Sequence, residues 1–147
     1  MTYQETISLS TVGHRDMHDI TGAAAAAVAR SGIRTGTAHI FNLGSTAIVG
    51  TIEYEPGLER DLPDLLDRLI PASRGYGHEK TWHDGNGHSH LQATLMGQEL
   101  TVPVARKACA RHLAADIPSR MQHQTARQEH RDNSDGRSRL RIAIPRK

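Results

Sequence analysis

Residues 82–91 hold the densest group of side chains in this chain that could do chemistry. They are Trp82, His83, Asp84, Gly85, Asn86, Gly87, His88, Ser89, His90 and Leu91. Imidazole is the commonest side-chain metal ligand and carries protons near neutral pH, and glycines let a backbone approach a ligand closely. Asp-Gly and Asn-Gly are also strong turn signals, so a solvated turn is the plain alternative. If the chain has a functional site, we expect it here.

The geometry of this stretch depends on its secondary structure, which the sequence leaves open. In a strand, His88 and His90 would point to one face and could converge on one ion or phosphate, whereas in a helix they would diverge. Three imidazoles with a nearby carboxylate suit Zn²⁺ by ligand type, although the spacing matches no established zinc motif. We predict His83, His88 and His90 as ligands of a divalent metal, Zn²⁺ or Mg²⁺, whose identity the sequence does not fix.

Bulk composition restricts the class of protein. The length of 147 residues suits one domain with a single core. Neither a run of about twenty apolar residues nor a charged segment followed by an apolar one is present, so we expect no membrane partner and no secretory signal. The lone Cys109 has no partner for an internal disulfide, and a cytoplasmic location is the resulting expectation.

Charge divides the chain into two unlike parts. Residues 1–104 hold seven Lys and Arg against twelve Asp and Glu, whereas residues 105–147 hold eleven against four. Such a basic tail on an acidic body is often a sign of nucleic-acid contact. Residues 105–147, however, contain no Phe, Trp or Tyr to stack on bases. We therefore predict no nucleic-acid partner.

Hydrophobic patterning predicts an α+β fold with a mixed or antiparallel sheet and two main helices. Strands are expected at 3–10, twice within 36–52 around a turn at 42–46, and at 100–104, and helices at 16–30 and from Pro56-Gly57 to Pro71. Five leucines between 58 and 69 recur at helical spacing, which predicts a stripe that faces the core. Residues 119–139 have too little apolar content to offset chain entropy, so only 140–144 could form a strand in the tail.

Several separated motifs resemble the YjbQ-like family of small cytoplasmic proteins. They are the stretch 82–91 followed by Ala93-Thr94-Leu95-Met96-Gly97 and Leu100-Thr101-Val102-Pro103-Val104, and earlier Ser45-Thr46-Ala47, Ile52-Glu53-Tyr54-Glu55-Pro56-Gly57 and Asp61-Leu62. The resemblance covers residues 1–104 and implies an α+β domain that assembles as a homotrimer. It also implies a secondary thiamine-phosphate synthase activity, which joins a pyrimidine carried on a diphosphate to a thiazole phosphate and releases pyrophosphate.

The resemblance assigns roles to individual residues. It implies catalytic roles for His78, His90 and Glu53. It implies binding of a phosphorylated small molecule by Ser45, Thr46, Asp84 and Asn86. Many family members carry a histidine where this chain has Gly44, and His83 and His88 fit only some members. The alternative is a non-catalytic module that binds a metal or small ligand through the His78–His90 region.

After Val104 the chain departs from the family, whose members continue with a hairpin resembling Gly-Lys-Leu-Ala-Leu-Gly-Thr-Trp-Gln and a final strand. Back-translation of residues 111–118, read one base later, can give Gly-Thr-Trp-Gln-Gln-Ile-Phe. We predict that residues from about 105 onward translate a shifted reading frame, so that a domain at 1–104 lacks its final hairpin and 105–147 is a largely disordered tail. The unpaired strand edges left behind would lower stability and impair trimer assembly.

Overall fold

The computed structural model describes residues 2–105, 121–125 and 137–145. Along the chain the elements are β1 (Thr2–Ser10), β2 (Asp16–Asp19), α1 (Thr21–Ser31), β3 (Gly36–Asn42), β4 (Ala47–Thr51), α2 (Leu58–Leu69), the 3-10 helix η1 (Gly77–Lys80), α3 (Gly87–Met96), β5 (Glu99–Val104), β6 (Met121–Thr125) and β7 (Arg137–Pro145). All described strand pairs are antiparallel. The predicted α+β class is confirmed.

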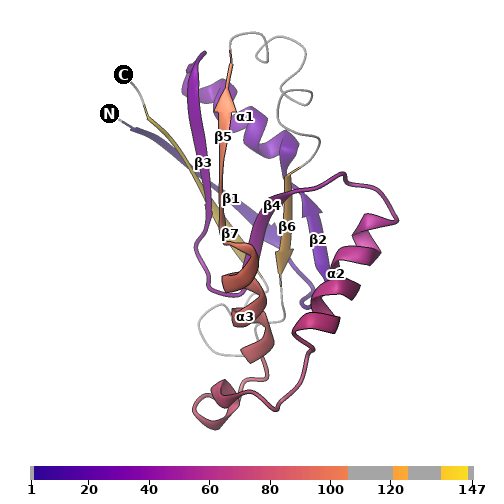
Figure 1. The fold of residues 1–147 in the computed structure, drawn as a ribbon. Coiled ribbons are helices and arrows are strands. Elements are labelled where there is room, and N and C mark those ends of the chain that lie inside the picture. Colours follow the sequence, from indigo (N-terminus) through magenta and orange to yellow (C-terminus); the bar gives the residue numbers. More distant parts are fainter. Residues whose placement is uncertain (1, 106–120, 126–136, 146–147) are drawn as a thin grey trace.

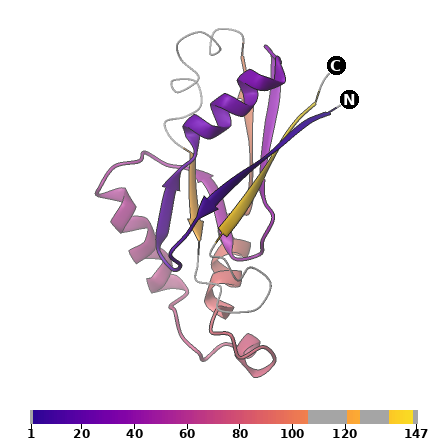
Figure 2. The same cartoon turned by 180° about the vertical axis from the view of Figure 1, so that it is seen from behind.

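The strands form two sheets, in the orders β1-β7-β3-β5 and β2-β6-β4. Strand β7 lies between β1 and β3, where Ile142 is opposite Glu5 on one side and Ile40 on the other. The two ends of the chain therefore lie side by side, although most of the sequence separates them (Figures 1 and 2). This pairing joins the beginning of the chain to residues near 145.

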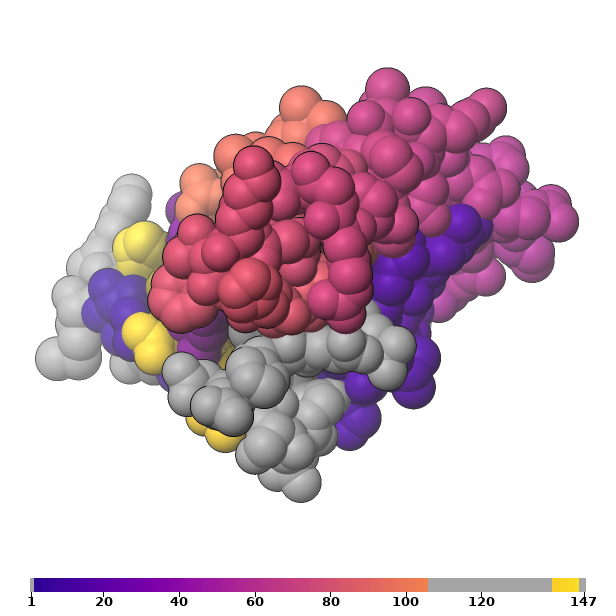
Figure 3. All heavy atoms as spheres, turned by 90° about the horizontal axis from the view of Figure 1, so that it is seen from below, coloured from indigo at the N-terminus to yellow at the C-terminus, as the bar shows by residue number. Residues whose placement is uncertain are grey.

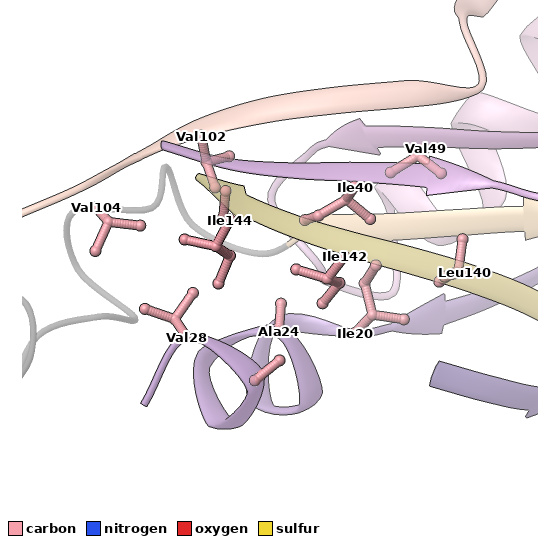
Figure 4. Packing of buried hydrophobic residues seen from close by; sticks show 12 residues of the cluster. Ile20, Ala24, Val28, Ile40, Val49, Val102, Val104, Leu140, Ile142 and Ile144 are labelled. Carbon is pink, nitrogen blue, oxygen red and sulfur yellow. The ribbon is translucent and has the colours of Figure 1, made fainter. Parts of the chain in front are cut away.

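The main core fills the space between the four-stranded sheet and α1. Leu140, Ile142 and Ile144 alternate along β7 and are completely buried, as expected for side chains that point to one face of a strand. Figure 4 shows Ala24 and Val28 of α1 directed at these residues. Because alanines have almost no side chain, the polyalanine run lets the helix axis come close to the sheet. Each large aliphatic side chain buried here contributes about 1.5–3 kcal/mol.

The first helix starts later than its sequence predicts. The strong helix formers are the alanines at 23–27, and residues 16–19 instead form β2, which pairs with β6. The carboxylate of Asp19 accepts a hydrogen bond from the backbone N–H of Thr21 at 2.9 Å, so a residue expected inside the helix instead precedes it. At the other end Gly32 takes a left-handed φ of 71°, a conformation that glycine adopts without steric cost.

Two strands lie in the part of the chain that was expected to be largely disordered. The prediction of no element in 119–139 is wrong at Met121–Thr125, because β6 is held by ladders to β2 and β4 on both sides. The strand predicted at 140–144 is confirmed within β7. Since β7 covers both β1 and β3, the unpaired edge predicted for a missing final strand does not form there. The shifted-frame prediction for 106–120 falls outside the described residues.

The leucine stripe of α2 faces the core on one side only. Leu66 is buried against Ile48 and Ala93, and Leu62 packs beside it. Leu65 and Leu69 are exposed by 46% and 60%, which corrects the prediction that all five leucines are core. None of the helices within the described ranges is long and apolar enough to cross a membrane.

Candidate functional site

Helix α3 and the 3-10 helix η1 carry most of the predicted site and form the lower end of the molecule in Figure 1. Seen from below, the pink and red spheres of residues 70–96 cover much of this end (Figure 3). The stretch 82–91 is a loop up to Asn86 and helix from Gly87 onward. His88 and His90 are therefore two positions apart on a helix, about 200° around its axis, and they diverge.

A buried carboxylate fixes the start of α3. Glu79, only 7% exposed, accepts hydrogen bonds from the backbone N–H groups of Gly85 at 2.7 Å and Gly87 at 3.0 Å. Burial alone would raise the pKa of Glu79, but these two N–H donors outweigh it and lower the pKa below its usual value. An anion is already in place where the helix dipole favours one, so the first N–H groups of α3 do not offer a phosphate site.

The loop before α3 is packed too closely for a side chain at position 87. A Cβ added to Gly87 would lie 3.1 Å from Glu79 Oε1 and 3.1 Å from the Cβ atoms of His78 and Tyr76. Gly85 has a φ of 77°. The two glycines therefore let the loop close on Glu79, the role that close packing gives to glycine.

On one side of α3, His90 meets His78. The ring centroids are 4.8 Å apart, and His78 Nε2 lies 3.2 Å from Asp84 Oδ1. That contact is outside hydrogen-bond geometry, so within the described ranges this nitrogen has no hydrogen-bond partner. Burial, then the charge of His78, lowers the pKa of His90, although a hydrogen bond to the Ser45 backbone opposes the shift. His90 is thus mostly neutral at physiological pH.

The turn at 43–46 approaches this pair and is braced from β3. The side-chain amide of Asn42 donates to the carbonyl of Gly44 at 2.8 Å. Ser45 is exposed beside His90, whereas Thr46 is buried. The structure thus brings Ser45, Asp84, His78 and His90 close to one another.

Arg74 adds a positive charge that the sequence analysis missed. Its Nη1 donates to the carbonyl of His83 at 3.4 Å, and its Nη2 would lie 3.2 Å from a Cβ on Gly85. The guanidinium therefore lies against the loop that carries Asp84. The only feature of the sequence that could have indicated Arg74 is its position in the polar loop that leads to His78.

On the other side of α3, His88 packs against a residue far away in the sequence. Its ring is 4.9 Å from that of His14 at an angle of 81°. His14 Nε2 lies 2.9 Å from Asp67 Oδ1, and Arg15 donates to Asp67 Oδ2 at 2.9 Å. Burial would raise the pKa of Asp67, but hydrogen bonds from His14, Gln92 and Arg15 lower it overall. Nothing in the local sequence connects residue 14 with residue 88.

The three predicted metal ligands are not gathered. His83 is exposed, with a left-handed φ of 59°, while His88 and His90 lie on different sides of α3. The helix separates residues that a strand would have aligned, so the structure does not bring this predicted set together. In the part of the chain that the structure describes, no group of three or more His, Cys, Asp or Glu side chains is arranged to hold a metal.

The remaining predicted residues lie apart from the imidazole pair or are enclosed. Glu53 is exposed in the connection from β4 to α2, and among the described contacts none joins it to His78 or His90. Asn86 is buried, and its Oδ1 atom has no hydrogen-bond partner in the described ranges. The Oδ1 atom of Asn86 can therefore accept a hydrogen bond only from a donor that enters the buried interior.

An antiparallel α+β fold with a polar, histidine-bearing end is the class that these observations define. The sequence model of the family described as UPF0047 protein YjbQ-like matches residues 5–131. The chain belongs to this family. The match continues past residue 104, where the resemblance of individual motifs ended.

Relatives and solved structures agree with this membership. A UPF0047 protein of Methanothermobacter thermautotrophicus is 34% identical over 102 residues, 69% of this chain and 70% of that protein. One of Archaeoglobus fulgidus is 31% identical over 98 residues, 67% and 74% of the two chains. The crystal structure of a YbjQ-like protein of unknown function from Sulfolobus solfataricus has a TM-score of 0.80 and 26% identity, with 98% of this chain and 96% of that one covered.

Proposed function

We propose that this protein is a transferase of the thiamine-phosphate synthase type, acting on phosphorylated small molecules. The observation that carries the proposal is the His78–His90 pair, with ring centroids 4.8 Å apart, next to the Ser45 backbone. Two imidazoles thus lie beside the turn that carries Ser45, and the Arg74 guanidinium lies against the 83–85 loop that precedes the same helix.

The reaction requires stabilisation of the departing diphosphate. The C–O bond between the pyrimidine methylene group and the diphosphate breaks, the thiazole nitrogen forms the new C–N bond, and pyrophosphate leaves with the electron pair. Donors aimed at the charge that develops on the leaving group lower the barrier. Arg74 would supply positive charge, and the His78 ring and the Ser45 hydroxyl would each donate a hydrogen bond. A Mg²⁺ ion bound to the diphosphate of the substrate would add to this charge.

His90 has a different part in this proposal. Because burial lowers its pKa, its ring stays neutral and can accept a hydrogen bond from the substrate. Asp84 Oδ1 lies 3.2 Å from His78 Nε2 and places a negative charge beside the other ring. Glu53 is left without a role in this site, since it lies outside the described contacts of the pair.

The test is an assay of the full chain with the two thiamine precursors, read by thiamine phosphate formation and by pyrophosphate release. His90→Ala and His78→Ala are each expected to lower kcat/KM by about 10²-fold, the lower range for loss of one group that stabilises developing charge. His83→Ala is the matched control, because this exposed histidine lies in the same loop. No product above the uncatalysed rate, or equal rates in all variants, would overturn the proposal.

The second candidate, a non-catalytic ligand-binding module, predicts a different pattern in the same assay. Either precursor would bind with a measurable heat, His78→Ala and His90→Ala would weaken that binding, and no product would form. The paired imidazoles favour this candidate as much as they favour binding in the transferase. Formation of thiamine phosphate in this assay distinguishes the transferase from the non-catalytic binding module.

We propose that the chain assembles as a homotrimer. In support, Leu91 and Leu95 lie four residues apart on α3 and are exposed by 46% and 61%, which places two apolar side chains on one helical face. Trp82 is exposed next to the same helix. Light scattering on the purified chain would give three times the chain mass, and Leu95→Lys would lower that mass. A monodisperse monomer would contradict this assignment.

We also propose that residues from about 105 onward translate a shifted reading frame. The Gly-Thr-Trp-Gln reading at residues 111–118 supports this proposal. Resequencing across the codon for Val104 is the direct test, and a verified continuous frame would reject it. A frame-restored chain is expected to melt at a higher temperature than the chain as it stands.

A further inference from the structure

The loop before α3 contains two dipeptides that are chemically labile. Asn86-Gly87 is the only Asn-Gly pair in the sequence, and Asp84-Gly85 directly precedes it. Glycine has no Cβ, so the backbone nitrogen after the Asn or Asp is open to attack the side chain. Both dipeptides are therefore prone to succinimide formation, the step that begins deamidation of Asn and isomerisation of Asp.

The reaction at Asn86 needs only the chain and water. The backbone nitrogen of Gly87 attacks Cγ of Asn86, a new N–C bond forms, and the C–N bond of the side-chain amide breaks. Ammonia leaves with the proton that the attacking nitrogen gives up. Water then opens the ring and leaves aspartate or isoaspartate at position 86. At Asp84 the same attack expels water, and ring opening consumes water again.

The fold itself requires glycine at both positions. A Cβ on Gly87 would lie 3.1 Å from atoms of three neighbouring residues. Gly85 has a φ of 77°, in the left-handed region that other residues seldom adopt. The close packing of the loop therefore carries a chemical liability at Asp84 and Asn86.

Glu79 binds both of the attacking nitrogens. Its Oε2 atom accepts a hydrogen bond from the N–H of Gly85 at 2.7 Å, and its Oε1 atom accepts one from the N–H of Gly87 at 3.0 Å. Burial opposes ionisation of Glu79, but the two N–H donors lower its pKa, so the carboxylate is charged near neutral pH. A backbone nitrogen loses its proton when it attacks, and an adjacent negative charge disfavours that loss.

Hydrogen bonds also hold the peptide between Asn86 and Gly87 in place. The carbonyl of Asn86 accepts from the N–H groups of Ser89 at 2.8 Å and His90 at 3.3 Å, while the N–H of the same peptide is bound to Glu79. Ring closure rotates this peptide away from the Asn86 ψ of 9° and would break these bonds. Asn86 is 2% exposed, so a new carboxylate at this position would be buried at a high free-energy cost.

We propose that Glu79 protects Asp84 and Asn86 from succinimide formation, and that Asn86 is the site of deamidation when this protection is lost. Isoaspartate would add a methylene group to the backbone immediately before α3, and the start of the helix that carries His88 and His90 would shift. The proposal does not depend on the transferase activity, because it concerns the stability of the loop in the chain alone.

The test follows deamidation of the full chain in mildly alkaline buffer without substrate. Peptide mapping by mass spectrometry and an isoaspartate methyltransferase assay measure the rate at Asn86. The folded chain should react far more slowly than the same chain unfolded in urea, which gives the unprotected rate. Glu79→Gln should react at least about tenfold faster than the folded parent, the factor that loss of one hydrogen bond to a charged group gives in a local opening equilibrium.

Two controls separate the effect of Glu79 from general instability. Glu53→Gln removes an exposed carboxylate and should leave the rate unchanged. Ile142→Ala destabilises the sheet core but leaves the loop intact, so it should react more slowly than Glu79→Gln. If circular dichroism shows that Glu79→Gln does not fold, Glu79→Asp, whose carboxylate is one methylene group shorter, takes its place.

Three results would overturn the proposal. The folded parent could react at Asn86 as fast as the chain in urea, the Glu79 variant could react no faster than the parent, or Ile142→Ala could react as fast as the Glu79 variant. Thiamine phosphate formation has no part in these rates, so a failure of the transferase proposal would leave this test unaffected.

Discussion

The two ends of this molecule bury different kinds of side chain. Between α1 and the four-stranded sheet the core is aliphatic, with side chains such as Ile40, Ile142 and Ile144 completely enclosed. Around α3 the buried residues are largely polar and include Glu79, Asn86 and His88. Burial of polar groups costs free energy unless each finds a partner. Burial of aliphatic side chains at the sheet end therefore stabilises the fold. This stabilisation offsets the free-energy cost of burying polar side chains around α3.

The largest effect on stability should come from the aliphatic end. Ile142→Ala removes a completely buried side chain from the strand that pairs with both β1 and β3, and we expect a loss of about 2–5 kcal/mol in the free energy of unfolding. Ile142→Val, which removes one methylene group, should cost about 0.5–1.5 kcal/mol. Urea unfolding of both variants measures the difference. A loss below 1 kcal/mol for Ile142→Ala would mean that β7 is not a central strand.

A pair of glycine substitutions compares the two ends directly. Gly87→Ala places a Cβ 3.1 Å from atoms of Tyr76, His78 and Glu79, and overpacking of this kind costs about 1–3 kcal/mol. Gly22→Ala on α1 meets no atom within 4 Å and should stabilise the helix by up to about 1 kcal/mol. Thermal unfolding of the two variants should give shifts of opposite sign. Shifts of the same sign would contradict the tight packing around Glu79.

Mild acid should weaken the α3 end before the sheet end. Burial lowers the pKa of His88 and of His90, so below about pH 6.5 the unfolded chain binds more protons at these residues than the native chain does. Stability is then present at neutral pH and is lost as the pH falls toward the native pKa values. The melting temperature should decrease from pH 7 to pH 5.

Substitution of the buried histidines checks this assignment. His88→Gln with His90→Gln should flatten the profile of melting temperature against pH, because the groups that take up protons on unfolding are gone. His39→Gln, on the exposed face of β3, is the control and should leave the slope as it was. A slope that persists in the double variant would place the acid sensitivity elsewhere.

The smallest effect is expected on the outer side of α2. Leu69→Ser changes a leucine that is 60% exposed and should alter the free energy of unfolding by no more than about 0.5 kcal/mol. Leu66→Ala, three residues earlier and 1% exposed, should cost about 2–5 kcal/mol. Similar losses for the two would show that something covers the outer face of this helix in solution.

Local signals in the sequence were enough to predict most of the fold. Alternation gave the strands at 3–10 and 100–104, and the polyalanine run and the leucine spacing gave α1 and α2. The sequence analysis missed β2 and β6, because Asp16–Asp19 and Met121–Thr125 are short, polar strands held by each other across the chain. Pairing between distant residues overrides local propensity in such strands.

The candidate site could be predicted only in part, for a related reason. His78, Asp84 and His90 lie within thirteen residues of one another, so their meeting could be expected from the sequence. His14 comes to His88 from the loop before β2, and Asp67 comes from α2. No local sequence pattern predicts that these distant residues meet. The placement of Glu79 under the start of α3 is equally invisible until the loop is folded.

The position of β7 has a consequence for the newborn chain on the ribosome. Register brings Thr2 opposite Pro145, so β1 and β3 emerge long before the strand that separates them has been synthesised. Contacts this distant in sequence slow folding, because the intervening loop must close first. During that delay the two waiting strands expose open edges to other chains. We therefore expect this protein to depend on holding chaperones during translation more than a protein whose first strands pair with each other.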